Sequence, residues 1–326
     1  MKWKNNHITS IGVDFYNNII DLNGSDDLSR VALGEKEFVP IGYGSNIIVW
    51  DDCTLLRVVP QIALEGPKGS LLRVSAGVIL DSLIKTILKC NKHHPIQYLS
   101  GIPGSVGGAV FQNSGAYNHT ISEFVVEVVC WDCHFHQKVI LTREQCNFGH
   151  RSSVFVEDPQ RYIILYAYID VCEKVINVLN ENNYKTIIER RIAKFPDPYA
   201  EPNSGALFMP TFIPHDDMRI GLLQHRGVEL FHDGDFFKIP SGRLIELCGL
   251  KGKHITTSLY LSPLHANFLC RSGKATPEEW FEAVSIVKET VEHQFGIALR
   301  PEVNVVGRNI PAYVKELCRT KEVVKI

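Results

Sequence analysis

The chain has 326 residues, 45% hydrophobic and 21% charged, an ordinary globular composition that leaves room for two or three domains. Its formal net charge of -2 gives no reason to expect binding to nucleic acid or to an anionic membrane. No run of residues reaches the roughly 20 apolar positions of a membrane helix, and no apolar segment follows the basic N-terminus. We therefore expect a cytoplasmic protein, and take it as a monomer.

The cysteines point to reduced thiols. There are nine of them, an odd number, and they are scattered without the regular spacing of a disulfide framework. Cys130 and Cys133 form a single CxxC, but no second ligand pair follows at zinc spacing. We interpret them as strand residues near a turn, and predict no metal site.

The first clear elements flank a glycine turn. Residues 38–41 (Phe-Val-Pro-Ile) have the pattern of a buried strand, and a second strand is predicted over 47–50. Between them lies Gly-Tyr-Gly-Ser-Asn at 42–46. A helix is predicted over 81–91, because Leu83, Ile84, Ile87 and Leu88 fall on one face.

Further elements follow in order. Strands are predicted over 125–131, 137–141 and 162–171, and a helix over about 175–192. Residues 194–212 are rich in proline and small residues, which predicts a loop or domain junction. The clearest helix opens at Thr276-Pro277 with Glu279 completing a capping box, and it ends at Gly296. Its predicted buried stripe is Trp280, Val284, Val287 and Val291.

The densest chemical motif is the glycine-rich segment 101–117. Five glycines lie within residues 101–115, too many for a helix interior or an ordinary strand. Such glycines allow close approach of a ligand and can expose amide groups that bind a pyrophosphate. Taken alone, the segment is equally compatible with a merely tortuous loop.

Six motifs in sequence carry a family resemblance. Residues 42–46 and 101–117 resemble the two flavin pyrophosphate loops of the UDP-N-acetylenolpyruvoylglucosamine reductase family. Residues 194–198 with 203–208 resemble its substrate loop, and residues 241–252, 265–268 and 299–303 resemble its later motifs. The order holds from about residue 38 to 308, whereas the first 35 residues match poorly.

The resemblance implies a fold and a reaction. It implies an α+β fold with an FAD-binding domain of the PCMH-like type in two parts and a separate substrate domain. The predicted regions are 1–57, 58–192 joined by 300–326, and 194–299. The implied activity is that of an oxidoreductase in peptidoglycan synthesis and cell-wall biogenesis, a flavoprotein that uses FAD and NADPH. It would reduce an enolpyruvyl ether on a UDP-sugar to a lactyl ether.

Site residues follow by position. Arg151 matches the arginine that stabilises the intermediate, and Glu302 matches the glutamate that stabilises or protonates it. Lys194, Asn203, Ser204, Lys251 and His265 match or adjoin the substrate positions. The predicted FAD-binding residues are Gly42, Tyr43, Gly44, Ser45, Asn46, Gly101, Ile102, Pro103, Gly104, Ser105, Gly107, Gly108, Ala109, Gln112, Asn113, Gly115, Ala116 and Tyr117.

One position departs from the family. The family places its proton-donor serine after a glycine, and here Ala206 follows Gly205. Three interpretations stay open. The first is a working enolpyruvyl reductase in which Ser204, a water or another acid supplies the proton. The second is an FAD oxidoreductase of the same fold with a different nucleotide-sugar or small enoyl substrate. The third is a catalytically inactive flavin-binding protein.

Overall fold

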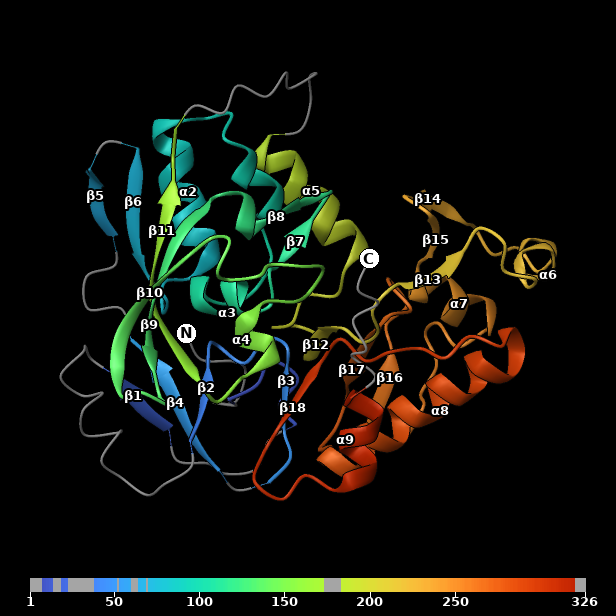
Figure 1. Cartoon of the computed structure of the whole chain (residues 1–326). Helices are drawn as coiled ribbons and strands as arrows, with labels where there is room; N and C mark the ends of the chain where they lie inside the picture. The colour runs from blue at the N-terminus through green and yellow to red at the C-terminus, as the bar shows by residue number, and fades with distance from the viewer. Residues whose placement is uncertain are drawn as a thin grey trace. The chain divides into compact units, whose positions relative to one another are not determined.

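The computed structural model describes residues 8–13, 19–22, 38–51, 53–59, 64–68, 70–172 and 183–319. These residues form two compact units (Figure 1). The central unit contains the described residues of 19–43 and 53–191. The C-terminal unit contains 8–13, 44–51 and 192–319. These two units are defined by how compactly their residues pack. The predicted division into three regions, which is based on their functions, stays a prediction. No helix among the described residues is long and apolar enough to cross a membrane.

The central unit is built on a five-stranded antiparallel sheet. Its order is β10-β9-β11-β6-β5. The predicted strands are confirmed as β9 (Val125–Asp132), β10 (Gln137–Thr142) and β11 (Tyr162–Asp170), and they are joined by β5 (Leu64–Lys68) and β6 (Leu71–Ser75). A parallel sheet of order β1-β4-β2 contains β1 (Ile19–Leu22), β4 (Thr54–Val58) and the predicted strand β2 (Phe38–Ile41). Cys130 lies in β9 and Cys133 just after it.

Short helices pack on the five-stranded sheet. The predicted helix is α2 (Leu80–Cys90), which buries Leu83, Ile84 and Ile87. The core also contains η2 (Pro95–Leu99), α3 (Val106–Phe111), η3 (Ile121–Glu123) and α4 (Val154–Glu157). The helix predicted over 175–192 falls partly on residues 173–182, outside the described residues. The described part, α5 (Tyr184–Lys194), runs two residues further, to the residue before Phe195-Pro196. A residue that precedes proline avoids helical backbone, which accounts for this end.

The C-terminal unit contains three small sheets. One has the order β12-β17-β16, from β12 (Asn203–Ala206), β17 (Phe268–Arg271) and β16 (Leu259–Leu261). A second has the order β13-β15-β14, from β13 (Thr211–Pro214), β15 (Phe236–Ile239) and β14 (Phe231–Asp233). The third pairs the predicted strand β3 (Ile47–Val49) in parallel with β18 (Asn304–Val306). The stretch 194–212, predicted as a loop or domain junction, begins just after the boundary between the units at residue 192, and it is not loop throughout, because Asn203 and Ala206 of β12 pair with β17.

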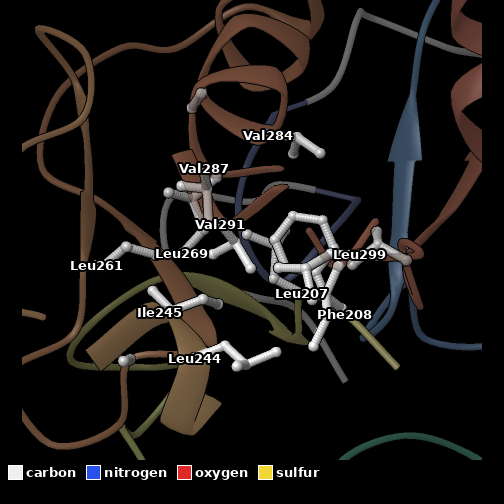
Figure 2. Packing of buried hydrophobic residues seen from close by; sticks show 14 of the residues in the cluster. Leu207, Phe208, Leu244, Ile245, Leu261, Leu269, Val284, Val287, Val291 and Leu299 are labelled. Carbon is white, nitrogen blue, oxygen red and sulfur yellow. The ribbon is translucent and has the colours of Figure 1, made fainter. Parts of the chain in front are cut away.

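Helix α8 (Pro277–Phe295) forms the centre of this unit's core. Trp280, Val284, Val287 and Val291 are all fully buried, as predicted, and Figure 2 shows the three valines packed among leucines and Phe208. Helices α6 (Ile220–His225), α7 (Ser241–Leu247) and α9 (Ala312–Arg319) complete the unit.

Both ends of α8 agree with the sequence prediction, except for one hydrogen bond of the predicted capping box at the N-terminus. The Thr276 hydroxyl accepts a hydrogen bond from the Glu279 amide, and Gly296 ends the helix with left-handed φ of 65°. The predicted capping box is not completed. The Glu279 carboxylate instead accepts hydrogen bonds from the Thr256 hydroxyl and the Ser258 amide, both at 2.8 Å. It therefore fixes the loop before β16 rather than the helix end.

Candidate functional site

The glycine-rich segment of the central unit is docked on the end of β6. Gly107 donates its amide to the Ala76 carbonyl at 2.8 Å, and a Cβ at Gly107 would lie 2.7 Å from that of Ala76. Only glycine allows this contact. Ser105 caps α3 by accepting from the Gly108 amide. The sequence around the helix start is thus explained in part by packing, and its role in ligand binding stays a prediction.

The two predicted flavin loops meet within this unit. A Cβ at Gly42 would stand 2.7 Å from the Ser105 hydroxyl and 3.7 Å from Gly108, so the two segments are in contact. Tyr43 donates its hydroxyl to the Gly77 carbonyl at 2.9 Å, and burial raises the pKa of this phenol.

Amide groups are available at this contact. Gly104 and Ser105 are buried residues, and neither amide donates a hydrogen bond within the described part of the chain. Buried amides without a protein acceptor are costly unless a ligand satisfies them. This arrangement fits a pyrophosphate at the contact between Gly42 and Ser105. The amides of Gly107 and Gly108, by contrast, are bonded within the protein.

The second half of the segment forms a hairpin. Strands β7 (Gly115–Ala116) and β8 (His119–Thr120) are joined by Tyr117 and Asn118, whose φ values of 53° and 62° are those of a type I′ turn. Asn118 thus adopts the left-handed backbone. Asn113, also left-handed, is buried and donates its side-chain amide to the Gly149 carbonyl at 2.8 Å. The hairpin is thereby attached to the loop that carries Arg151.

Arg151 lies against the hairpin in a strained backbone. Its φ is 52°, a conformation that costs a non-glycine residue about 1–2 kcal/mol. Its guanidinium donates to the carbonyls of Asn113 and Gly115, at 3.5 and 3.2 Å. Strain of this kind is common at functional sites. The half-buried side chain is therefore held beside the glycine-rich segment.

A second arginine in the same place was missed by the sequence analysis. A Cβ at Gly101 would approach Arg191 of α5 at 3.0 Å, so this side chain covers the start of the glycine-rich segment. Burial lowers the pKa of Arg191, Tyr117 raises it, and the nearby charge of Arg151 lowers it further. Two neighbouring guanidinium groups favour an anion between them. In the sequence, only the spacing of Arg191 three residues before the predicted ligand Lys194 could have indicated it.

In the C-terminal unit, the remaining flavin-loop residues lie beside the strand that carries Ala206. A Cβ at Gly205 would lie 3.9 Å from the Ser45 carbonyl. Asn46 donates its side-chain amide to the Glu302 carbonyl at 3.5 Å. The amide of Glu302 donates to the Leu207 carbonyl at 2.9 Å. The predicted acid Glu302, the flavin-loop residues 45–46 and Ala206, which stands at the position of the family's serine, are therefore adjacent along the backbone.

Asn203 and Ser204 are both buried in β12. The side-chain amide of Asn203 donates to the Pro196 and Glu201 carbonyls, and its oxygen accepts from the Gly205 amide. Asn203 thus shapes the loop. The Ser204 hydroxyl is fully buried and makes no hydrogen bond within the described residues.

Two lysines form a cationic cluster beside a histidine in this unit. Burial lowers the pKa of His265, and the charges of Lys194 and Lys251 lower it further. His265 stacks on Phe195, with ring centroids 5.3 Å apart, and its Nδ1 accepts from the Asn267 amide. Lys251 also contacts Glu246 at 3.0 Å, which lowers the pKa of that carboxyl. The three residues predicted for an anionic substrate are thus brought together.

Comparisons with known proteins find relatives over most of the chain. Residues 197–306 match the family model of the UDP-N-acetylenolpyruvoylglucosamine reductase C-terminal domain, and residues 27–133 match that of an FAD binding domain. A reductase of this name from Idiomarina loihiensis is 28% identical over 310 residues, covering 89% of this chain and 92% of the relative. One from Xanthomonas axonopodis pv. citri is 28% identical over 307 residues, covering 86% and 87%.

A solved structure shows the same fold. The UDP-N-acetylenolpyruvylglucosamine reductase of Thermus caldophilus superposes with a TM-score of 0.67 at 22% identity, covering 92% of this chain and 96% of that one. The expected α+β fold with a PCMH-like FAD-binding domain is confirmed. With one model on each half and relatives along nearly the whole length, the chain is a divergent member of the UDP-N-acetylenolpyruvoylglucosamine reductase family.

Proposed function

We propose that this chain, with FAD bound, uses NADPH to reduce the enolpyruvyl ether of a UDP-sugar to a lactyl ether in the cytoplasm. The observation that carries the proposal is the backbone adjacency of Glu302, Ser45 and the Gly205-Ala206 strand. It brings an acid, part of a flavin loop and the family's proton-donor position into one place.

The residues of the glycine segments would hold the cofactor. The amides of Gly104 and Ser105, which donate no hydrogen bond within the described residues, suit the pyrophosphate next to Gly42, and Arg191 adds a half-buried positive charge. FAD, when bound, would supply a hydride to the terminal vinyl carbon, with NADPH as the reductant that is oxidised to NADP⁺. The protein would have to deliver a proton to the carbon that bears the carboxylate.

The charged residues have separate tasks in this proposal. Arg151 binds the substrate carboxylate, which gains charge in the transition state, and a preorganised guanidinium stabilises such charge strongly. Lys194 and Lys251 bind the diphosphate or a carboxylate of the substrate. His265, whose lowered pKa keeps it neutral at pH 7, contributes a hydrogen bond rather than charge. Glu302 stabilises the intermediate or passes a proton toward it.

Ala206 favours a second candidate. It carries no exchangeable proton, and the Ser204 hydroxyl, two residues away, is fully buried. An FAD oxidoreductase of this fold whose substrate is a different nucleotide-sugar or small enoyl compound would not need the serine. The cationic cluster still requires that substrate to be anionic.

Stopped-flow reoxidation of the reduced flavin separates the two candidates. Flavin reduction by NADPH should be fast, because it needs no proton from position 206. Reoxidation by UDP-N-acetylglucosamine enolpyruvate should be slow, and Ala206→Ser should raise its rate ten-fold or more, since a positioned general acid contributes roughly 10²–10⁴-fold. Ser204→Ala is the matched control, and should change little.

Two results would contradict this. Fast reoxidation of the unaltered protein that Ser204→Ala abolishes would make Ser204 the donor. Failure of the UDP-sugar to bind, with no gain from Ala206→Ser, would favour the second candidate.

A further inference from the structure

The N-terminal segment 8–13 is built into the interior of the C-terminal unit. Thr9, Ser10, Ile11 and Val13 are between 0% and 3% exposed, and the last two belong to its main hydrophobic cluster. This stretch lies in the part of the chain that matches the family motifs poorly. Such complete burial of a short extended segment needs a structural or functional reason.

Ser10 connects two loops of the proposed site. Its amide donates to the Gly44 carbonyl at 2.9 Å. Its hydroxyl oxygen lies 2.6 Å from the Asn203 carbonyl and 3.2 Å from the Ser45 carbonyl, so one O–H is shared between the flavin loop and the Ala206 strand. Gly44 itself is pressed against Ile8, where a Cβ would collide with the Ile8 carbonyl.

The segment is also anchored at its other end. Arg271, at the end of β17, donates from Nε to the Ile11 carbonyl at 2.6 Å. The amide of Arg271 donates to the Pro202 carbonyl, next to the start of β12. Residues 8–13 are therefore bound to the sheet that carries Ala206 through Arg271, and to the flavin loop through Ser10.

We propose that Ser10 is a positioning residue that sets the distance between the flavin loop 44–46 and the strand 203–206. It touches no reacting atom. Its hydroxyl is the shared donor to a carbonyl on each side, and hydrogen bonds in buried surroundings fix geometry tightly. The catalytic part of this inference rests on the proposed function, because the strand matters for the reaction only if the substrate is reduced beside it.

The test compares three variants. Ser10→Ala removes the hydroxyl with little change in side-chain volume, whereas Ser10→Thr keeps the hydroxyl. Thr276→Ala, which removes the cap of α8 in the same unit, is the matched control for a general loss of stability. Each is assayed for the unfolding midpoint, for FAD affinity by titration of the apoprotein, and for reoxidation of the reduced flavin by the UDP-sugar.

We expect Ser10→Ala to weaken FAD affinity and to slow reoxidation, each by roughly ten-fold, the effect of one lost buried hydrogen bond. Ser10→Thr should restore both, and Thr276→Ala should lower only the midpoint. The inference is overturned if Ser10→Ala lowers the midpoint as Thr276→Ala does while FAD affinity and reoxidation stay unchanged.

Two further readouts keep the test decisive. If Ser10→Ala does not fold, Ser10→Cys keeps a side chain of the same shape, slightly larger and with a weaker donor, and the same two losses are expected in smaller measure. If the unaltered protein does not react with the UDP-sugar, the proposed function fails. The FAD titration then decides on Ser10 alone, and an unchanged affinity overturns its role.

Discussion

At the scale of single residues, Arg151 combines strain with charge. Its left-handed backbone and its bonds to the Asn113 and Gly115 carbonyls hold the guanidinium beside the glycine-rich hairpin. A side chain fixed in this way loses little freedom when it binds a carboxylate. Its chemistry therefore depends on the backbone as much as on the guanidinium itself.

Replacing this side chain should separate ligand binding from cofactor binding. We expect Arg151→Ala to bind FAD within a few-fold of the unaltered protein, and to lose the change in the flavin spectrum on adding the UDP-sugar. Loss of a charge-assisted bidentate contact costs a few kcal/mol, so the ligand affinity should fall by about 100-fold. Arg161→Ala, which removes an arginine that pairs with Asp132 in the same unit, should leave both unchanged. Equal ligand affinity in all three proteins would make Arg151 structural.

His265 should make the stability of the protein depend on pH. Its pKa lies below the ordinary 6.5 because of burial, Lys194 and Lys251, with Glu246 opposing them. The unfolded chain therefore takes up the proton first, and stability falls as the pH drops through 6.5 to the folded value. Above pH 6.5 this group contributes no pH dependence. His265→Gln should flatten this slope below about pH 6.5 in thermal unfolding, and identical slopes would exclude the effect.

At the scale of elements, α8 shows which parts of the fold the sequence could predict. Its cap, its first-turn proline, its buried stripe and its final glycine are all local signals, and all are confirmed. The hydrogen bonds that the Glu279 carboxylate accepts could not be predicted, because their donors lie about twenty residues earlier in the chain. Strand β12 was missed for the same reason, since β17 follows it by some sixty residues.

The role of Glu279 can be measured against its neighbour. Glu278 and Glu279 both lie in the first turn of α8, where each carboxylate favours the helix equally. Only Glu279 also accepts bonds from Thr256 and Ser258. Glu279→Ala should therefore lower the unfolding free energy by about 1–3 kcal/mol more than Glu278→Ala, as denaturant unfolding would show. Equal effects would mean that the carboxylate serves only the helix.

At the scale of the whole molecule, the glycine-rich segments were visible in the sequence and the charges around them were not. Glycine density marked 101–117, where only glycine tolerates contacts such as that of Gly107 with Ala76, whereas 42–46 was identified by resemblance, and the flavin-binding role of both stays a prediction. Arg191 lies in a helix of ordinary composition, and only folding brings it to Gly101. The three residues Lys194, Lys251 and His265 were each identified by resemblance, whereas their proximity depends on three separate elements.

Removing FAD should destabilise the folded chain. Neither glycine segment contains a cysteine or histidine that could bind the flavin covalently, so denaturation should release yellow FAD. Adding FAD to the apoprotein at about 100 times its Kd should stabilise it by about 2.7 kcal/mol. Calorimetry with and without FAD measures this. A colourless protein whose unfolding temperature does not change when FAD is added would contradict FAD as the cofactor.

The interleaved order of the two units has a consequence for biosynthesis. The C-terminal unit takes residues 8–13 and 44–51 from the beginning of the chain and 192–319 from its end. On the ribosome, the central unit can complete its contacts once residue 191 has emerged. The buried residues Ile11 and Val13 must wait, solvent-exposed, until their core partners on α8 have been made. Residues 8–13 are thus translated before most of their unit and reach their native place late, and a delay late in translation would prolong their exposure to aggregation and proteolysis.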